Sequence, residues 1–231
     1  MSVLDSFRLD GRRAIVTGAS RGLGSAMADA LEEAGAQVVR FSSRDADLGD
    51  RAAVASLLDR AGDADILVNN AGIIRRAALL DYSDDDWDAV LEVNLRAVFT
   101  LSRDFARRLA ERKQGGRIIN IASMLSFQGG IRVPAYTAAK SALLGLTRAM
   151  ANELAPLGIN VNAIAPGYMT TDNTQALRDD PQRNREILAR IPAARWGTPA
   201  DLAGAVVFLA SDAAEYVHGT VLAVDGGWLS R

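Results

Sequence analysis

The chain has 231 residues, of which 49% are hydrophobic and 23% charged, and it contains no cysteine. This length is enough for one large domain with a substantial core. The formal net charge of −2 gives no basis for electrostatic binding to nucleic acid or to an acidic membrane. The lack of cysteine excludes disulfides, thiol catalysis and thiolate metal sites.

The amino-terminal residues give no sign of export. The stretch from Met1 to Ser6 lacks a basic region followed by an apolar one, the pattern of a signal peptide. No uncharged apolar run approaches the ~20 residues that are needed to cross a bilayer. We therefore expect a cytoplasmic protein that has neither a membrane nor a nucleic acid as its partner.

Short apolar runs alternate along the chain with longer stretches of helical periodicity. The runs are rich in Val and Ile and do not alternate with polar residues, which is typical of strands buried on both faces. The strand candidates are Ala14–Thr17, Gln37–Phe41, Ile66–Asn69, Arg117–Ile121, Asn160–Ile164 and Thr220–Val224. The helix candidates are Leu23–Ala34, Arg51–Arg60, Asp84–Glu111, Tyr136–Ala155 and Pro199–Leu209. This order predicts an α/β fold with a parallel sheet, in one domain over residues 1–231.

A glycine-rich segment directly follows the first predicted strand. It reads T-G-A-S-R-G-L-G over residues 17–24. Glycines at 18, 22 and 24 permit a tight turn and let backbone amides approach a pyrophosphate at a helix N-terminus. A loose glycine pattern is also compatible with a purely structural turn. Its place between the first strand and the first helix favours nucleotide binding.

Small or polar residues also follow two other predicted strands. N-N-A-G stands at residues 69–72, and Pro166-Gly167 is followed by Thr170 and Thr171. The carboxyl ends of parallel strands meet at one edge of a sheet. The three segments therefore outline one crevice in which a cofactor can lie across the strand ends.

The stretch from Ser123 to Lys140 holds a candidate set for proton transfer. Tyr136 and Lys140 are four residues apart and share one face if the segment is helical. An unperturbed phenol loses its proton near pH ~10, and an ammonium one turn away is expected to lower this pKa. Ser123, at the end of a predicted strand, can face the tyrosine. The set is suited to moving a proton on or off an alcohol oxygen, although Y-x-x-x-K alone also describes a surface pair.

Together these motifs resemble the short-chain dehydrogenase/reductase family, in order and spacing and over nearly the whole chain. The matching positions are T-G-x-x-x-G-x-G at 17–24, N-N-A-G at 69–72, Asn94, Ser123, Tyr136, Lys140 and P-G at 166–167. The resemblance implies a Rossmann-type doubly wound sheet and an NAD(P)-dependent oxidoreductase that interconverts a secondary alcohol and a ketone. This chemistry requires no metal, and we expect the single histidine, His218, to be structural or solvated.

The resemblance also implies a role for each site residue. Tyr136 is the general acid/base, and Ser123 orients the substrate oxygen. Lys140 lowers the Tyr136 pKa and binds the nicotinamide ribose, while Asn94 holds a water in a proton relay. The expected cofactor contacts are Gly18, Ser20, Arg21, Gly22, Leu23, Gly24, Ser42, Ser43, Arg44, Asp47, Leu48, Asn70, Ala71, Gly72, Tyr136, Lys140, Pro166, Gly167, Met169 and Thr171.

Within the family, the second half of the chain is most similar to members that act on a deoxy-keto-sugar acid such as 2-dehydro-3-deoxy-gluconate. A substrate carboxylate favours a guanidinium, and Arg132 is the first candidate because it lies four residues before Tyr136. Arg75 and Arg76 are second candidates, and Gln128 also suggests a polar pocket. A 3-oxoacyl-thioester reductase or other small carbonyl reductase, and a non-catalytic dinucleotide-binding protein, are the alternatives.

The segment after the second predicted strand is short. Only five residues separate Phe41 from Asp47, whereas a parallel crossover needs roughly a dozen or more. We predict that the helix usual here in the family is missing and that the third, edge strand is lost or vestigial.

This shortening leaves the choice between NAD and NADP open. Ser42 stands where NAD-specific members place an acidic residue, and Ser42, Ser43, Arg44 and Arg21 could accept a 2′-phosphate. These residues favour NADP, while the sugar-acid resemblance favours NAD. The family also implies a homotetramer, with the helices predicted at 84–111 and 136–155 between subunits. The apolar tail from Val221 to Leu229 forms a further interface or is buried within its own subunit.

Overall fold

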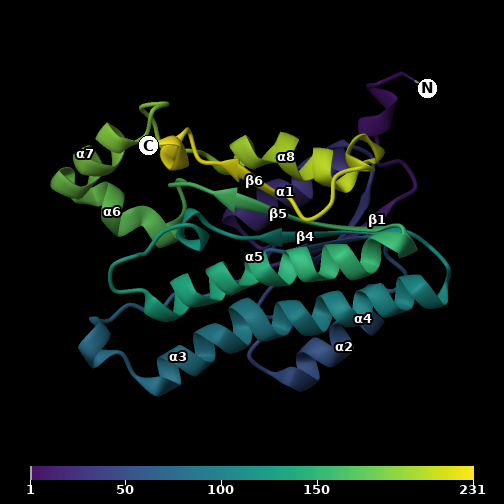
Figure 1. Ribbon diagram of the computed structural model, residues 1–231, viewed down its shortest axis with the longest axis horizontal. Helices are drawn as coiled ribbons and strands as arrows, with labels where there is room; N and C mark the ends of the chain where they lie inside the picture. Colours follow the sequence, from purple (N-terminus) through teal and green to yellow (C-terminus); the bar gives the residue numbers. More distant parts are fainter. Residues whose placement is uncertain (1) are drawn as a thin grey trace.

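The computed structural model describes residues 2–231, so Met1 of the amino-terminal stretch lies outside the described residues. Figure 1 shows one central sheet between two layers of helices. Within the described residues the sheet has six parallel strands in the order β2-β1-β3-β4-β5-β6. Their bounds are β1 Arg13–Thr17, β2 Gln37–Phe41, β3 Ile66–Asn69, β4 Gly116–Ile121, β5 Ile159–Pro166 and β6 Val221–Val224.

The three central strands are buried along their whole length, as their uninterrupted apolar character predicts. The strand order reverses beside β1, because β2 pairs with one edge of β1 and β3 with the other. In an open parallel sheet, such a switch point creates a crevice at the carboxyl ends of the strands. The glycine-rich turn follows β1 and therefore lies in this crevice.

Helices cover both faces of the sheet (Figure 1). On one face α1 (Gly22–Glu33) packs against α8 (Ala203–Ala210) and the short 3-10 turn that precedes it. The opposite face carries α2 (Arg51–Ala61), α3 (Asp84–Leu91), α4 (Ala97–Glu111) and α5 (Pro134–Leu154). Each layer encloses its own apolar core, with Leu31 and Val206 in one and Leu67 and Leu101 in the other.

The long helix predicted over Asp84–Glu111 is interrupted. A π turn over Glu92–Arg96 separates α3 from α4, and the fully buried Asn94 lies in this turn. Such insertions often accompany functional sites. The helical periodicity continues across the turn, so the sequence alone gave no sign of the break.

Two short helices at the carboxyl ends of the strands were not predicted. They are α6 (Gln175–Asp179) and α7 (Pro181–Arg190), which project from the body of the molecule in Figure 1. A usable signal was present in the sequence, where Asp180 directly precedes a proline, the pattern of a helix cap. In the structure Asp180 caps α7 and accepts hydrogen bonds from the amides of Gln182 and Arg183.

The chain from Ser42 to Asp50 forms turns between β2 and α2, with neither a helix nor a strand. Consequently β2 is the edge strand of the described sheet. Asp50 caps α2 by accepting a hydrogen bond from the Ala52 amide. None of the described helices is both long and apolar enough to cross a bilayer.

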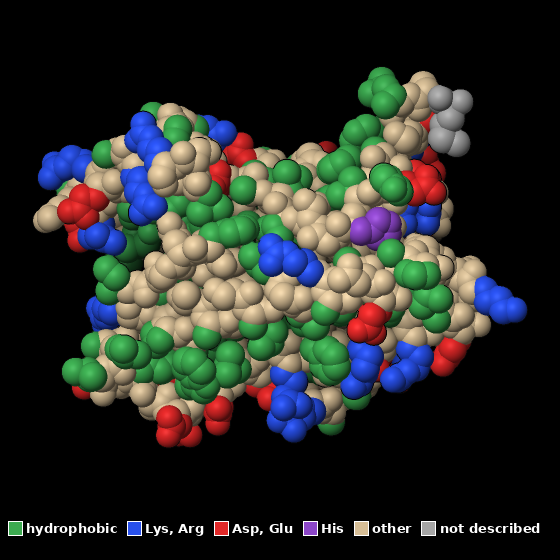
Figure 2. All heavy atoms as spheres, in the orientation of Figure 1, with side chains coloured by type: hydrophobic (Ala, Val, Ile, Leu, Met, Phe, Trp, Pro, Cys, Tyr) green, Lys and Arg blue, Asp and Glu red, His purple; other side chains and the backbone are tan. Residues whose placement is uncertain are grey.

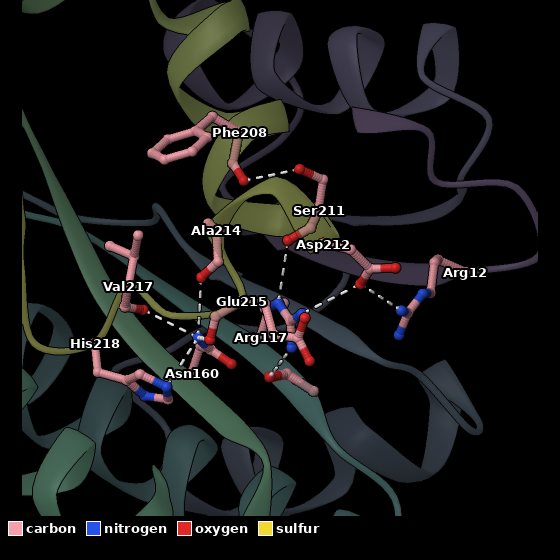
Figure 3. A network of polar contacts seen from close by, with 11 residues as sticks. Arg12, Arg117, Asn160, Phe208, Ser211, Asp212, Ala214, Glu215, Val217 and His218 are labelled. Atoms are coloured by element: carbon pink, nitrogen blue, oxygen red, sulfur yellow. Dashed lines mark hydrogen bonds and ion pairs between the residues drawn. The ribbon is translucent and has the colours of Figure 1, made fainter. Parts of the chain in front are cut away.

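At the opposite end of the sheet, a polar network ties the amino ends of β4 and β5 to the segment after α8 (Figure 3). Burial lowers the pKa of the Arg117 guanidinium, which donates a hydrogen bond to the Ser211 carbonyl and pairs with Asp212. His218 lies 3.2 Å from the Asn160 amide. This network is remote from the crevice, which agrees with a structural place for His218.

We expect substitution of Asn160 to lower the stability of the fold without changing catalysis. Its amide nitrogen donates to the carbonyls of Ala214, Glu215 and Val217 at 3.1, 2.8 and 3.0 Å. Asn160→Ala leaves buried carbonyls without this donor and should lower the free energy of unfolding by about 1–3 kcal/mol. Urea unfolding measures the loss, and an unchanged midpoint would contradict it. Turnover at a temperature where the variant is folded should match that of the wild type.

Candidate active site

The glycine-rich turn is locked to the segment after β3 by Thr17. The Thr17 hydroxyl oxygen accepts hydrogen bonds from the amides of Asn70 and Ala71, each at 3.1 Å. In return the Asn70 side chain donates to the carbonyls of Thr17 and Gly18 at 2.9 and 3.1 Å. Two of the three predicted cofactor segments are therefore held against each other.

The turn is packed too closely for any side chain at two of its glycines. A Cβ atom on Gly24 would lie 2.2 Å from the Gly18 carbonyl oxygen, and one on Gly18 would lie 2.9 Å from the Ala71 Cα. Gly18 also has a φ of +65°, which favours glycine. Because α1 begins at Gly22, its first amides have no partner within the helix. This backbone cradle fits a dinucleotide pyrophosphate.

Asn94 clamps the strand-end segment from the other side. Its Oδ1 accepts a hydrogen bond from the Ile73 amide at 2.9 Å, and its Nδ2 donates to the Ile73 carbonyl at 2.8 Å. A Cβ on Gly72 would lie 2.6 Å from Asn94 Oδ1 and 3.9 Å from Lys140 Nζ. Asn94, Gly72 and Lys140 thus meet at one point of the crevice.

Ser123 follows β4 and caps a short 3-10 turn. Its Oγ accepts a hydrogen bond from the Leu125 amide at 3.1 Å, and its own amide donates to Ser126 Oγ at 3.3 Å. Ser126 Oγ in turn donates to the Lys140 carbonyl at 2.7 Å, which ties the turn to α5. The Ser123 side chain is also close enough to the Tyr136 phenol to lower the pKa of that phenol.

Tyr136 and Lys140 lie one turn apart near the start of α5, as predicted. Lys140 is only 4% exposed, and its Nζ donates to the Ile121 carbonyl at 2.6 Å and lies 5.6 Å from the centre of the Tyr136 ring. The buried ammonium therefore reaches the end of β4, beside Ser123. The structure brings all four predicted catalytic residues together.

A layer of buried amides and hydroxyls supports these residues from below. Asn69 Nδ2 donates to Ser102 Oγ and Asn120 Oδ1, both at 2.9 Å, and Asn120 Nδ2 donates to Thr147 Oγ1 at 2.9 Å. This chain links β3, β4, α4 and α5 below the reactive groups. Asn120 was not among the predicted site residues, although a polar residue near the end of an apolar strand was a usable signal.

Comparison with known proteins decides the family. A family model described as enoyl-(acyl carrier protein) reductase matches residues 44–229. The 2-dehydro-3-deoxy-D-gluconate 5-dehydrogenase of Escherichia coli K12 is 53% identical, over 99% of this chain and 100% of its own length. The chain belongs to the short-chain dehydrogenase/reductase family. It is therefore an NAD(P)-dependent oxidoreductase.

Solved structures agree with this family assignment. A candidate 2-deoxy-D-gluconate 3-dehydrogenase of Agrobacterium tumefaciens with bound NADP has a TM-score of 0.94 and 53% identity, over 98% of this chain and 99% of that one. A candidate NAD(P)-dependent gluconate 5-dehydrogenase of Beutenbergia cavernae with NADP at low occupancy also reaches 0.94, with 50% identity over 98% and 100%. The Rossmann-type parallel sheet expected for this dehydrogenase is thus confirmed.

The pKa of the phenol in the free dehydrogenase is set mainly by burial, and its predicted lowering by Lys140 stays a prediction. Burial raises the pKa of Tyr136 above its ordinary value, and the nearby Ser123 side chain and the Arg76 charge only partly oppose this effect. Burial also lowers the pKa of Lys140 to about 8. At neutral pH the phenol is protonated and most of the lysine is charged, so the free enzyme is poised to donate a proton.

The remaining cofactor residues predicted for this dehydrogenase lie on the glycine turn, around the end of β5 and in the shortened segment after β2. Ser20 and Leu23 belong to the glycine turn. Pro166 is the last residue of β5, and Gly167, Met169 and Thr171 follow it. Gly167 is close-packed, since a Cβ there would lie 2.6 Å from the Asp225 Cα. In the shortened segment Leu48 is buried, while Ser43, Arg44 and Asp47 are exposed.

The structure separates the candidate substrate residues. Arg132 is exposed, with a φ of +64°, and its carbonyl accepts a hydrogen bond from the Ala77 amide. The Arg75 guanidinium pairs with Asp86 at 3.4 Å and lines an outer groove with Phe99. Gln128 is held by Arg190 of α7 at 3.0 Å. Arg76 differs from both other arginines, because its charge lowers the pKa of Tyr136.

Proposed function

We propose that this enzyme interconverts a hydroxyl and a ketone on a deoxy-keto-sugar acid, with 2-dehydro-3-deoxy-gluconate as the first candidate substrate. The observation that carries the proposal is the meeting of Ser123, Tyr136 and Lys140 beside the dinucleotide cradle, with the Arg76 guanidinium within electrostatic reach of the phenol. The name of the Escherichia coli relative supports the same substrate class.

In this proposal the protein positions the carbonyl and supplies one proton. When bound, the nicotinamide delivers hydride to the carbonyl carbon or accepts it from the alcohol. Tyr136 donates its proton to the carbonyl oxygen in reduction and takes it back in oxidation. Ser123 holds that oxygen, and the Lys140 ammonium stabilises the phenolate that forms. Gly18, Gly22 and Gly24 hold the pyrophosphate.

Asn94 contributes to this proposal through the backbone. Both polar atoms of its amide are already bonded to Ile73. The Asn94 side chain therefore holds the segment after β3 in place. A water that returns the proton to solvent would bind beside Asn94 and Lys140, which meet at Gly72.

Turnover by the purified protein tests the substrate class. Initial rates, followed by nicotinamide absorbance, are compared for the keto-sugar acid and for a 3-oxoacyl thioester. We expect kcat/KM for the sugar acid to be the larger by on the order of 100-fold. Its carboxylate can form a charge-assisted hydrogen bond with the protein, which is worth about 1.5–3 kcal/mol and which the thioester lacks. A preference for the thioester would contradict the proposal.

Arg76 is the arginine best placed to bind the substrate carboxylate. It also donates a hydrogen bond to the Asn173 carbonyl at 3.2 Å, which brings it to the segment after β5. Arg76→Ala should raise KM for the sugar acid by roughly 10- to 100-fold through the loss of one charge-assisted hydrogen bond.

Arg132→Ala is the matched comparison for this measurement. We expect little change in KM, because the Arg132 side chain is exposed and its backbone makes the contact with Ala77. An increase in KM for Arg132→Ala, with none for Arg76→Ala, would assign the carboxylate to Arg132 instead.

The proposed assembly is a homotetramer. Large apolar side chains are exposed around α3 and at the start of α4, where Leu80 is 97% exposed, Phe99 43% and Trp87 38%. Hydrophobic side chains gather over this region in Figure 2. In the tail, Trp228 is buried against Tyr168 of the same chain, with ring centroids 4.8 Å apart. Light scattering with Phe99→Glu tests the helical interface.

A further inference from the structure

An acidic side chain lies at the end of β2, although the position directly after the strand is a serine. The Ala19 amide of the glycine turn donates a hydrogen bond to the Phe41 carbonyl at 3.0 Å. Ser42 is therefore adjacent to the turn that follows β1. In dinucleotide-binding folds this is where the ribose of the adenosine half is recognised, by a carboxylate for a diol or by arginine for a 2′-phosphate.

Asp45 occupies the hydrogen-bond donors of this position. Its Oδ2 accepts from the Ser42 amide at 2.8 Å and from the Ser42 hydroxyl at 2.6 Å. These two donors are those that an incoming anion would use. The same hydrogen bonds, together with the charges of Arg60 and Arg44, hold the pKa of Asp45 below its ordinary value. The carboxylate is therefore ionised throughout the neutral range.

The turn that carries Asp45 is held from below by α2. The Arg60 guanidinium lies 5.3 Å from the centre of the Phe41 ring and donates to the Asp45 carbonyl. The next residue, Ala46, is 6% exposed and packs in the core. Asp45 is thus an exposed side chain on a fixed backbone, which the short connection between β2 and α2 brings back to the strand end.

The cationic side chains nearby are poorly placed to offset the repulsion between Asp45 and a 2′-phosphate. Arg21 of the glycine turn pairs with Asp172 at 2.7 Å, so a 2′-phosphate would have to compete with a carboxylate for it. Arg44 is exposed, and its amide donates to the Ser42 hydroxyl at 3.2 Å. A phosphate here would lie close to the negative charge of Asp45, whereas a ribose diol could donate hydrogen bonds to it.

We propose that Asp45 sets the cofactor preference of this enzyme, by accepting the adenosine ribose diol of NAD and by repelling the 2′-phosphate of NADP. The inference rests on the proposed placement of the dinucleotide at the glycine turn. The choice between NAD and NADP is thereby made by a residue within the shortened turn, because Ser42, at the strand end, cannot make it. It also sets this chain apart from the Agrobacterium tumefaciens structure, which holds NADP.

Binding of the two reduced cofactors without substrate tests this directly. Dissociation constants for NADH and NADPH are measured by nicotinamide fluorescence with the wild type, Asp45→Asn and Asp45→Ser. The wild type should bind NADH more tightly. Asp45→Asn keeps an acceptor for the Ser42 amide, so the turn is retained while the charge is lost. Each variant should shift the ratio of the two constants toward NADPH by on the order of tenfold or more.

Asp50→Asn is the matched control. It removes one negative charge from the same connection and keeps the cap of α2, because asparagine caps helices as well as aspartate does. Solvent screening should keep its effect on the ratio to about twofold or less. A wild type that prefers NADPH, or an unchanged ratio in both Asp45 variants, would overturn the inference. Failure to turn over a sugar acid would refute the proposed substrate and leave this result intact.

Discussion

Tyr136→Phe should lower kcat by roughly 10²- to 10⁴-fold, the contribution expected of a positioned general acid. The substitution removes one hydroxyl from the wall of the crevice and leaves the ring in place, so the fold is retained. Because that hydroxyl is partly desolvated, its loss should not lower stability. Steady-state kinetics with the sugar acid measure the loss, and cofactor affinity measured by fluorescence should stay near that of the wild type.

Tyr216→Phe makes the same chemical change at a fully exposed tyrosine. It should turn over like the wild type. If Tyr136→Phe did so as well, the proton would have to come from another group, and the proposed role of the Ser123–Tyr136–Lys140 cluster would be wrong.

Gly24→Ala should weaken dinucleotide binding by on the order of 10²-fold. The new Cβ atom would lie 2.2 Å from the Gly18 carbonyl oxygen and 2.4 Å from the Asn70 amide nitrogen, so the turn has to move. A displacement of about 1 Å in a positioned site can cost on the order of 10²-fold. Overpacking should also lower the free energy of unfolding by about 1–3 kcal/mol.

The matched control is Gly204→Ala in α8, where a Cβ meets nothing within 4 Å. Alanine is the better helix former, so this variant should be up to about 1 kcal/mol more stable and should bind NADH normally. Titration of both variants with NADH separates a local effect at the turn from a general effect of removing a glycine. Wild-type affinity in Gly24→Ala would contradict the assignment of the cradle.

Most of the sheet could be predicted because its strands are short, apolar and buried on both faces. Gln37–Phe41 and Ile66–Asn69 were predicted with the bounds that the structure shows. The π turn at Asn94 could not be predicted, because the pattern of buried residues continues through it and the Asn94 side chain is bonded to Ile73, outside the helix. That contact joins residues distant in sequence.

The catalytic residues could be predicted because their types and spacing are dictated by chemistry. The electrostatics could not, since the desolvation that raises the pKa of Tyr136 depends on how α5 packs on the folded sheet, chiefly against β5. Which of Arg75, Arg76 and Arg132 binds the substrate carboxylate also could not be predicted. The direction in which the folded backbone points each side chain decides this, and the sequence does not reveal it. Asp45 was missed for a similar reason, because only the folded turn returns it to the end of β2.

The most direct test of the proposed chemistry is the pH dependence of kcat/KM in both directions, with wild type and Lys140→Met. Reduction needs a protonated phenol and a charged lysine, and burial sets the pKa of Lys140 to about 8. The rate constant for reduction should be flat below that pH and fall about tenfold per unit above it, while that for oxidation rises and then levels off.

Lys140→Met should remove the break near that pH and lower both rate constants. A wild-type reduction profile that stays flat to about two units above the lysine pKa would contradict the account, because the ammonium would then play no part in proton transfer from Tyr136.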